Sequence, residues 1–178
     1  GSEMCIRDRG KAAGTVSTLT LNDTASLSAL HLQVGRTSQG IVNQNGGTVT
    51  LTGDLRLGLD AGAATASRYN LTAGTVTAVG TFSAGGTDAG ADGGTYFNFT
   101  AGSTGSLTIA GTVGNLNTRI DNGWIRFNDT AYASGDAIWS IVDNDGSTTL
   151  SIIPEPSSFA LFAGISLLVV GIARRKRA

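Results

Sequence analysis

The sequence predicts an all-β repeat solenoid, a right-handed parallel β-helix, followed by a C-terminal transmembrane α-helix. Between Lys11 and Ile153 there are 23 Thr but no Glu and only one Lys, so strand formers outweigh helix formers. Similar segments recur along this region, and an apolar stretch near the C-terminus ends in four cations. An antiparallel β-sandwich is the alternative arrangement of the strands.

Residues 10–113 are expected to form the solenoid. Similar segments place Gly47, Gly74 and Gly102 at matching positions, and each glycine precedes a stretch in which polar and apolar residues alternate. Alternation indicates strands with one buried face, and units this short must stack on their neighbours to bury it. Equivalent glycines should therefore occupy equivalent corners, and the residues expected to point inward are Val49, Leu51, Val76, Leu107 and Ile109.

Residues 114–152 break this period and contain both tryptophans, Trp124 and Trp139. We interpret this segment as the C-terminal cap of the solenoid, because the last coil of a stack needs side chains that cover its open end. The turn-forming residues at 143–146 are expected to lead into the last strand.

The tail has three expected parts: a Pro-Glu-Pro linker at residues 153–157, a short transmembrane helix at 158–173 and a basic cytoplasmic tail at 174–178. Lys and Arg next to a membrane span stay on the cytoplasmic side. This predicts a single-pass protein of the inner membrane whose N-terminus lies outside the cytoplasm. The orienting cations are Arg174, Arg175, Lys176 and Arg177.

The order of Pro154, Glu155 and Pro156, a hydrophobic stretch and a basic cluster resembles the PEP-CTERM sorting signal. That resemblance implies export, processing near the motif by an exosortase-type membrane enzyme, and arrival at the cell surface or extracellular matrix. The repeats, including the Leu-x-Leu-Gly segment at residues 55–58, resemble autotransporter-associated β-strand repeats. This second resemblance implies a β-helix.

Residues 1–9 are expected to be a non-native scar. Their composition is unrelated to that of the repeats, and they resemble the translation of a sequencing adapter. Met4 is the only methionine, so removing the scar leaves no start codon. We therefore expect the chain to be a C-terminal fragment whose upstream repeats are missing.

No catalytic residue, metal site or cofactor is expected. His31 is the only histidine, alternation places it on a polar strand face, and Cys5 lies in the suspected scar, so the usual zinc ligands are missing. Asp143 and Asp145 match only part of a calcium loop. Most of the remaining aspartates neighbour Gly or Asn, which is typical of turns, while Asp54 and Asp129 are less clearly placed. The turn candidates are Asp60, Asp88, Asp92, Asp121 and Asp136.

Taken together, the sequence favours an exported, non-enzymatic β-repeat protein that is sorted to the cell envelope or exopolysaccharide matrix. Exopolysaccharide is a candidate partner, whereas the net charge of −4 between residues 11 and 153 argues against nucleic acid. The alternative is a polysaccharide-degrading or polysaccharide-binding β-helix whose active residues lie in the missing N-terminal part. More Thr- and Gly-rich repeats upstream would support the first interpretation, and clustered charges on one face the second.

Overall fold

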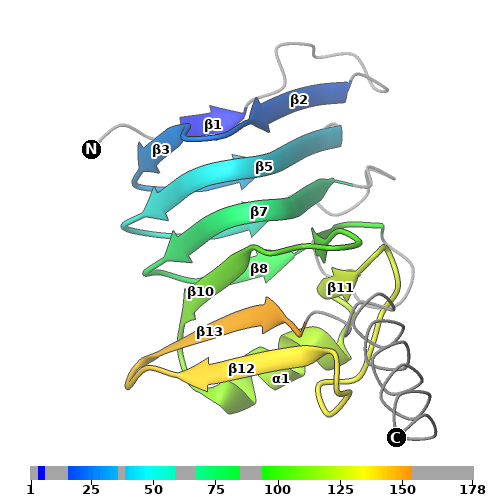
Figure 1. The fold of residues 1–178 in the computed structure, drawn as a ribbon. Helices are drawn as coiled ribbons and strands as arrows, with labels where there is room; N and C mark the ends of the chain where they lie inside the picture. The colour runs from blue at the N-terminus through cyan, green and yellow to red at the C-terminus, as the bar shows by residue number, and fades with distance from the viewer. Residues whose placement is uncertain (1–3, 7–15, 36–38, 59–66, 85–93, 154–178) are drawn as a thin grey trace, which may run out of the picture.

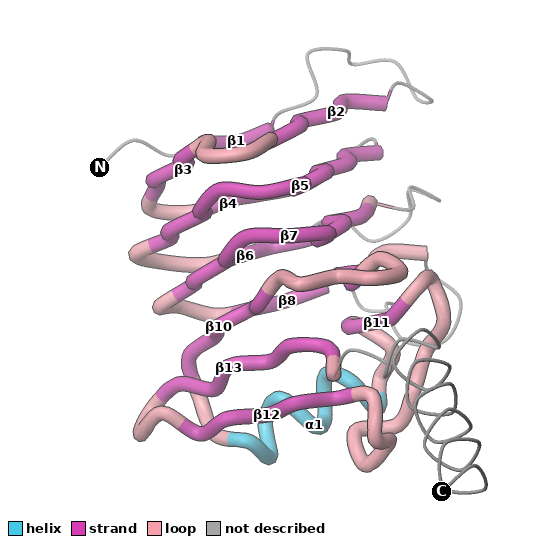
Figure 2. Tube along the Cα trace, in the orientation of Figure 1, coloured by secondary structure: helices cyan, strands magenta, loops and turns pink. Residues whose placement is uncertain are grey.

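The computed structural model describes residues 4–6, 16–35, 39–58, 67–84 and 94–153, which form a β-solenoid of about three turns (Figures 1 and 2). The predicted β-solenoid is therefore confirmed. The smaller sheet, sheet A, contains in order β1 (Met4–Ile6), β4 (Leu32–Val34), β6 (Leu55–Leu57) and β8 (Phe82–Ala84). The larger sheet, sheet B, contains β2 (Val16–Leu21), β3 (Ser26–Ala29), β5 (Gln39–Leu51), β7 (Arg68–Ala78), β9 (Tyr96–Phe99), β10 (Ser106–Ala110), β11 (Ile125–Phe127), β12 (Trp139–Asp143) and β13 (Ser147–Ile152).

Strands of successive coils pair in parallel and in register. Strand β5 pairs with β7 so that Val49 lies beside Val76, and β6 pairs with β8 so that Leu55 lies beside Phe82. Both pairs join residues that are 27 positions apart, which is the spacing of the sequence repeats. Each repeat therefore forms one coil, as expected for units that bury their apolar face against their neighbours. The antiparallel sandwich does not describe these coils.

The core lies between the two sheets, where the inward residues of every coil meet. The five residues predicted to point inward are at most 1% exposed, because alternate side chains of a strand point to opposite faces. Aromatic rings fill the core at β7 and β9: Tyr69 stacks on Phe97 with ring centroids 4.8 Å apart, and the ring centroids of Phe97 and Phe99 are 5.3 Å apart. Burial of one such ring contributes about 1.5–3 kcal/mol.

The polar side chain of Gln44 lies fully buried in this core. Its Nε2 donates to the carbonyl oxygens of Gly47 and Thr75 at 3.1 and 3.2 Å, and its Oε1 accepts a hydrogen bond of 2.5 Å from the Tyr69 hydroxyl. A buried amide is tolerated when its donors and acceptors are paired. Two of these three hydrogen bonds, those with Thr75 and Tyr69, join Gln44 to the next coil, and the third stays within its own coil.

Two of the three repeat glycines occupy equivalent corners. Gly47 and Gly74 have φ values of +73° and +92° and are followed by the paired residues Thr48 and Thr75. Gly102 shares the positive φ, but three residues separate it from Ser106, which pairs with Thr75. This insertion moves the third corner out of register, so the predicted equivalence holds for Gly47 and Gly74 only.

The segment predicted as a cap contains a helix as well as strands. Helix α1 (Val113–Asp121) buries Leu116 and Ile120, one turn apart, against the core. It ends in a Schellman motif, in which Trp124 N–H donates to Arg119 O and Gly123 has a φ of +70°. Beyond it, β12 and β13 form an antiparallel hairpin, and β13 also pairs antiparallel with β10 (Figure 1).

The predicted fold class needs correction in two respects. The chain is mostly β rather than all-β, because α1 interrupts the strands. In the part of the chain that the structure describes, no helix is long and apolar enough to cross a membrane: apolar residues alternate with polar ones, and α1 has nine residues where a span needs about 20. The expected span at 158–173 lies outside the described residues. The predicted location as a single-pass protein of the inner membrane depended on a spanning helix, and the described residues do not support it.

Candidate functional site

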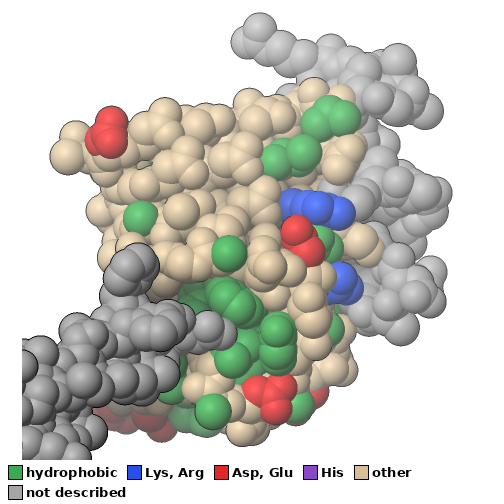
Figure 3. Space-filling model, turned by 45° about the vertical axis from the view of Figure 1, so that its right-hand side comes forward, with side chains coloured by type: hydrophobic (Ala, Val, Ile, Leu, Met, Phe, Trp, Pro, Cys, Tyr) green, Lys and Arg blue, Asp and Glu red, His purple; other side chains and the backbone are tan. Residues whose placement is uncertain are grey.

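The outward face of sheet B carries columns of small polar side chains, with one residue from each coil. Parallel strands lie about 4.8 Å apart, so a group repeated in each coil recurs at that distance. At the end of the stack, the Thr108 hydroxyl lies 2.8 Å from that of Thr149 on β13. Most of the face shown in Figure 3 is uncharged. The two hydroxyl columns are Ser26, Thr48, Thr75 and Ser106, and Ser28, Thr50, Thr77 and Thr108.

A column of asparagines runs along the other half of sheet B. Asn70 Nδ2 donates to Asn43 Oδ1 at 2.9 Å, and Asn98 Nδ2 donates to Asn70 Oδ1 at 3.2 Å. The last amide, that of Asn98, accepts a hydrogen bond of 2.9 Å from the backbone N–H of Asp129. Each ladder bond uses one of the two N–H groups of the donating amide, so every member keeps at least one N–H group that the ladder does not use. We call these three residues the Asn ladder.

The Asn ladder ends beside a cluster of charged and aromatic side chains, which we call the Arg–Tyr cluster. Its members are Arg68, Tyr96, Arg126 and Asp129. The guanidinium carbons of Arg68 and Arg126 lie 5.0 and 4.2 Å from the centroid of the Tyr96 ring. The Tyr96 hydroxyl donates to Asp129 Oδ1 at 2.7 Å, and the same oxygen lies 3.6 Å from Arg68 Nη1. Two cations are thus held over one ring beside one carboxylate.

Strand register explains how these residues meet. Arg68 begins β7 and lies beside Tyr96 at the start of β9, while Arg126 on β11 lies beside Asn98. Burial raises the pKa of Tyr96 to about 12, and the hydrogen bond to Asp129 acts in the same direction. The phenol is therefore neutral at physiological pH and remains a donor to Asp129. With Tyr96 neutral, two arginines and one aspartate leave the cluster with a net charge of +1.

A second polar group lies at the corner between the two sheets. The Nδ1 of His31 accepts a hydrogen bond of 2.8 Å from the backbone N–H of Asp54, and the His31 side chain is half-buried there. The Asp54 carboxylate accepts from Thr81 N–H at 2.6 Å and pairs with Arg56. The Thr81 N–H and then Arg56 hold the pKa of this carboxyl below its usual range, although burial opposes them. These contacts join three consecutive coils.

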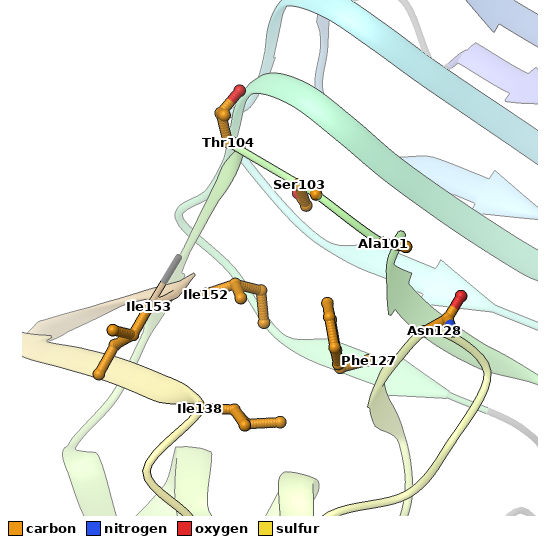
Figure 4. A pocket seen from close by; sticks show the side chains of 9 residues that line it. Ala101, Ser103, Thr104, Phe127, Asn128, Ile138, Ile152 and Ile153 are labelled. Carbon is orange, nitrogen blue, oxygen red and sulfur yellow. The ribbon is translucent and has the colours of Figure 1, made fainter. Parts of the chain in front are cut away.

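A cavity of about 440 Å³ lies between the insertion after Gly102 and the terminal hairpin (Figure 4). Apolar side chains from β11, from β13 and from the residues beside the hairpin line most of it, while Ser103 and Thr104 lie above it in this view and Asn128 lies to the right. The large apolar residues that line it are Phe127, Ile138, Ile152 and Ile153.

The sorting residues predicted from the sequence, Pro154, Glu155 and Pro156, lie outside the described residues, as do the four cations at 174–177. Several aspartates within the described part accept hydrogen bonds: Asp143 accepts from Asp145 N–H at 3.2 Å in the hairpin turn, and the side chains of three others accept from neighbouring groups. These three are Asp121, Asp136 and Asp129. The turn candidates Asp60, Asp88 and Asp92 lie outside the described residues.

Sequence reasoning missed the Arg–Tyr cluster, although a signal for part of it was present. Aligning the segment that begins at Tyr69 with the one that begins at Phe97 also aligns Arg68 with Tyr96. Strand β11 continues the same register by one further coil and so adds Arg126. Because residues 114–152 were interpreted as a cap, the relation of β11 to the repeats was not recognised from the sequence.

No protein-family model, curated protein or solved structure matches this chain. Functional conclusions therefore rest on the contacts of its own residues. Among these, the polar columns of sheet B and the adjoining Arg–Tyr cluster combine neutral hydrogen-bonding groups with a small positive charge on one face of the solenoid.

Proposed function

We propose that this protein is an exported, non-enzymatic β-repeat protein that is sorted to the cell envelope or exopolysaccharide matrix. The observation that carries the proposal is the outward face of sheet B, where hydroxyl and amide groups repeat once per coil. Such groups keep a β surface hydrated, and they offer hydrogen bonds at regular intervals to a hydroxyl-rich polymer. The stacked coils provide a rigid support for this display.

We further propose that an exosortase-type enzyme processes the chain at Pro154-Glu155-Pro156. The position of the motif supports processing there, because the folded domain extends to the residue before Pro154: Ile153 N–H donates to Ile138 O at 2.9 Å. Proline has a fixed φ and disfavours helix in the residue before it, so a Pro-Glu-Pro segment favours an extended backbone. An extended backbone next to a stable domain is a good protease substrate.

The test is to express the gene in a host that contains an exosortase and to measure the mass of the exported protein. The wild-type protein should lose the residues beyond about Pro156, and a Pro154→Ala, Glu155→Ala, Pro156→Ala triple variant should keep them. A Ser157→Ala, Ser158→Ala variant is the matched control and should be processed normally. Recovery of full-length wild-type protein would refute the sorting proposal.

A further inference from the structure

The Arg–Tyr cluster holds more hydrogen-bond donors than its neighbours use. Among the described residues, Arg68 Nε is buried and has no hydrogen-bond partner, and Arg68 Nη1 approaches Asp129 only to 3.6 Å. Arg126 uses its Nε for Gly123 O at 3.1 Å, which leaves its terminal nitrogens for other partners. A guanidinium carries five donors in a planar fork that matches a carboxylate.

We propose that this cluster binds the carboxylate groups of an acidic polysaccharide, with Arg68 and Arg126 as its donors. Charge complementarity supports the assignment, because the cluster carries a net charge of +1 and one carboxylate would balance it. The side chain of Arg68 is 38% exposed, so a ligand can reach it, and the Tyr96 ring holds both guanidinium groups in place. Pre-positioned donors lose less side-chain entropy when a ligand binds.

The Asn ladder favours a saccharide over an acidic peptide. It starts beside Arg126 and continues over two further coils, and the amides of Asn70 and Asn43 are only half-buried. Neutral amides that recur about every 4.8 Å suit a chain rich in hydroxyl groups. A polymer that combines carboxylates and hydroxyls matches the cluster and the ladder together.

The identity of the natural ligand rests on the proposed function, which places the protein in an exopolysaccharide matrix. Binding itself can be measured independently of sorting. Purified full-length chain is titrated calorimetrically with oligogalacturonate, with a neutral glucan oligomer of similar length and with oligoglutamate, at low and high salt. We expect binding to oligogalacturonate alone, weakened by salt because the contact is ionic. Loss of sorting with binding intact would overturn only the proposed function, and loss of binding with sorting intact only this inference.

The variants are Arg68→Gln and Arg126→Gln, each expected to weaken oligogalacturonate binding about tenfold or more, the range for a charge-assisted hydrogen bond. Arg56→Gln is the matched control, since its side chain is 40% exposed and lies at a different corner. Circular dichroism of each variant establishes that it is folded. An Arg126→Lys variant extends the test if Arg126→Gln misfolds, and it should also bind more weakly because lysine lacks the fork. No binding, equal binding of oligoglutamate, or equal weakening by Arg56→Gln would overturn the proposal.

Discussion

Replacing Gly74 with alanine should destabilise the stack more than the same replacement at Gly102, although both glycines have a positive φ. At Gly74, a Cβ would lie 2.3 Å from Gly47 O and 2.8 Å from Gly46 C. Both contacts are backbone atoms of the preceding coil, and they lie between Asn45 and Thr48, which are paired with β7. At Gly102, a Cβ would meet nothing within 4 Å. The pair therefore separates the effect of backbone conformation from the effect of close coil packing.

The left-handed conformation costs about 1–2 kcal/mol for a residue with a Cβ, and both variants should lose this amount. The backbone contact at Gly74 forces the two coils apart, and overpacking of this kind costs about 1–3 kcal/mol more. We therefore expect a loss of roughly 2–5 kcal/mol for Gly74→Ala and roughly 1–2 kcal/mol for Gly102→Ala.

Urea unfolding followed by circular dichroism measures the difference. With an m-value of about 2 kcal/mol per molar urea, an extra loss of about 2 kcal/mol lowers the unfolding midpoint by about 1 M. Gly74→Ala should therefore unfold at a clearly lower urea concentration than Gly102→Ala. Equal midpoints would show that the coils separate without resistance at this corner, and the argument from close packing would be wrong.

Two further predictions concern buried tyrosines. Tyr69→Phe removes the donor to Gln44 Oε1 and leaves that oxygen unpaired in the core, so urea unfolding should show a loss of about 1–3 kcal/mol, and an unchanged midpoint would contradict this role. The raised pKa of Tyr96, about 12 against an ordinary 10, means that its contribution to stability is complete below pH 10 and is lost as the pH rises from 10 towards 12. The midpoint temperature of thermal unfolding should therefore fall less steeply between pH 8 and pH 11.5 for Tyr96→Phe than for the wild type. Parallel curves for the two proteins would refute this role of Tyr96.

Much of the solenoid could be predicted from local patterns. Alternation identified the apolar inward side chains of β5, β7 and β10, because a strand has only two faces and apolar residues make up most of the core. The repeat spacing predicted one coil per unit, because equivalent positions must pair when identical units stack. Neither inference requires knowledge of distant contacts.

Helix α1 illustrates a signal that was present but weak. Leu116 and Ile120 lie one helical turn apart, and Asn122 followed by Gly123 is a typical helix end. However, Gly114, Asn115 and Asn117 are poor helix formers, so local propensity did not favour a helix. The end of the stack stabilises α1, because its apolar side chains have a core to cover only once the coils have formed.

The sequence alone therefore determined which side chains face the core and how the repeats stack, because both follow from periods of two and of about 27 residues within one chain. Only the tertiary structure decided that Arg68, Tyr96, Arg126 and Asp129 share one site, and that the insertion after Gly102 displaces the third corner. The physical reason is that a cluster of this kind forms across three coils. Its members meet through the register of strand pairing, which no single segment of the sequence contains.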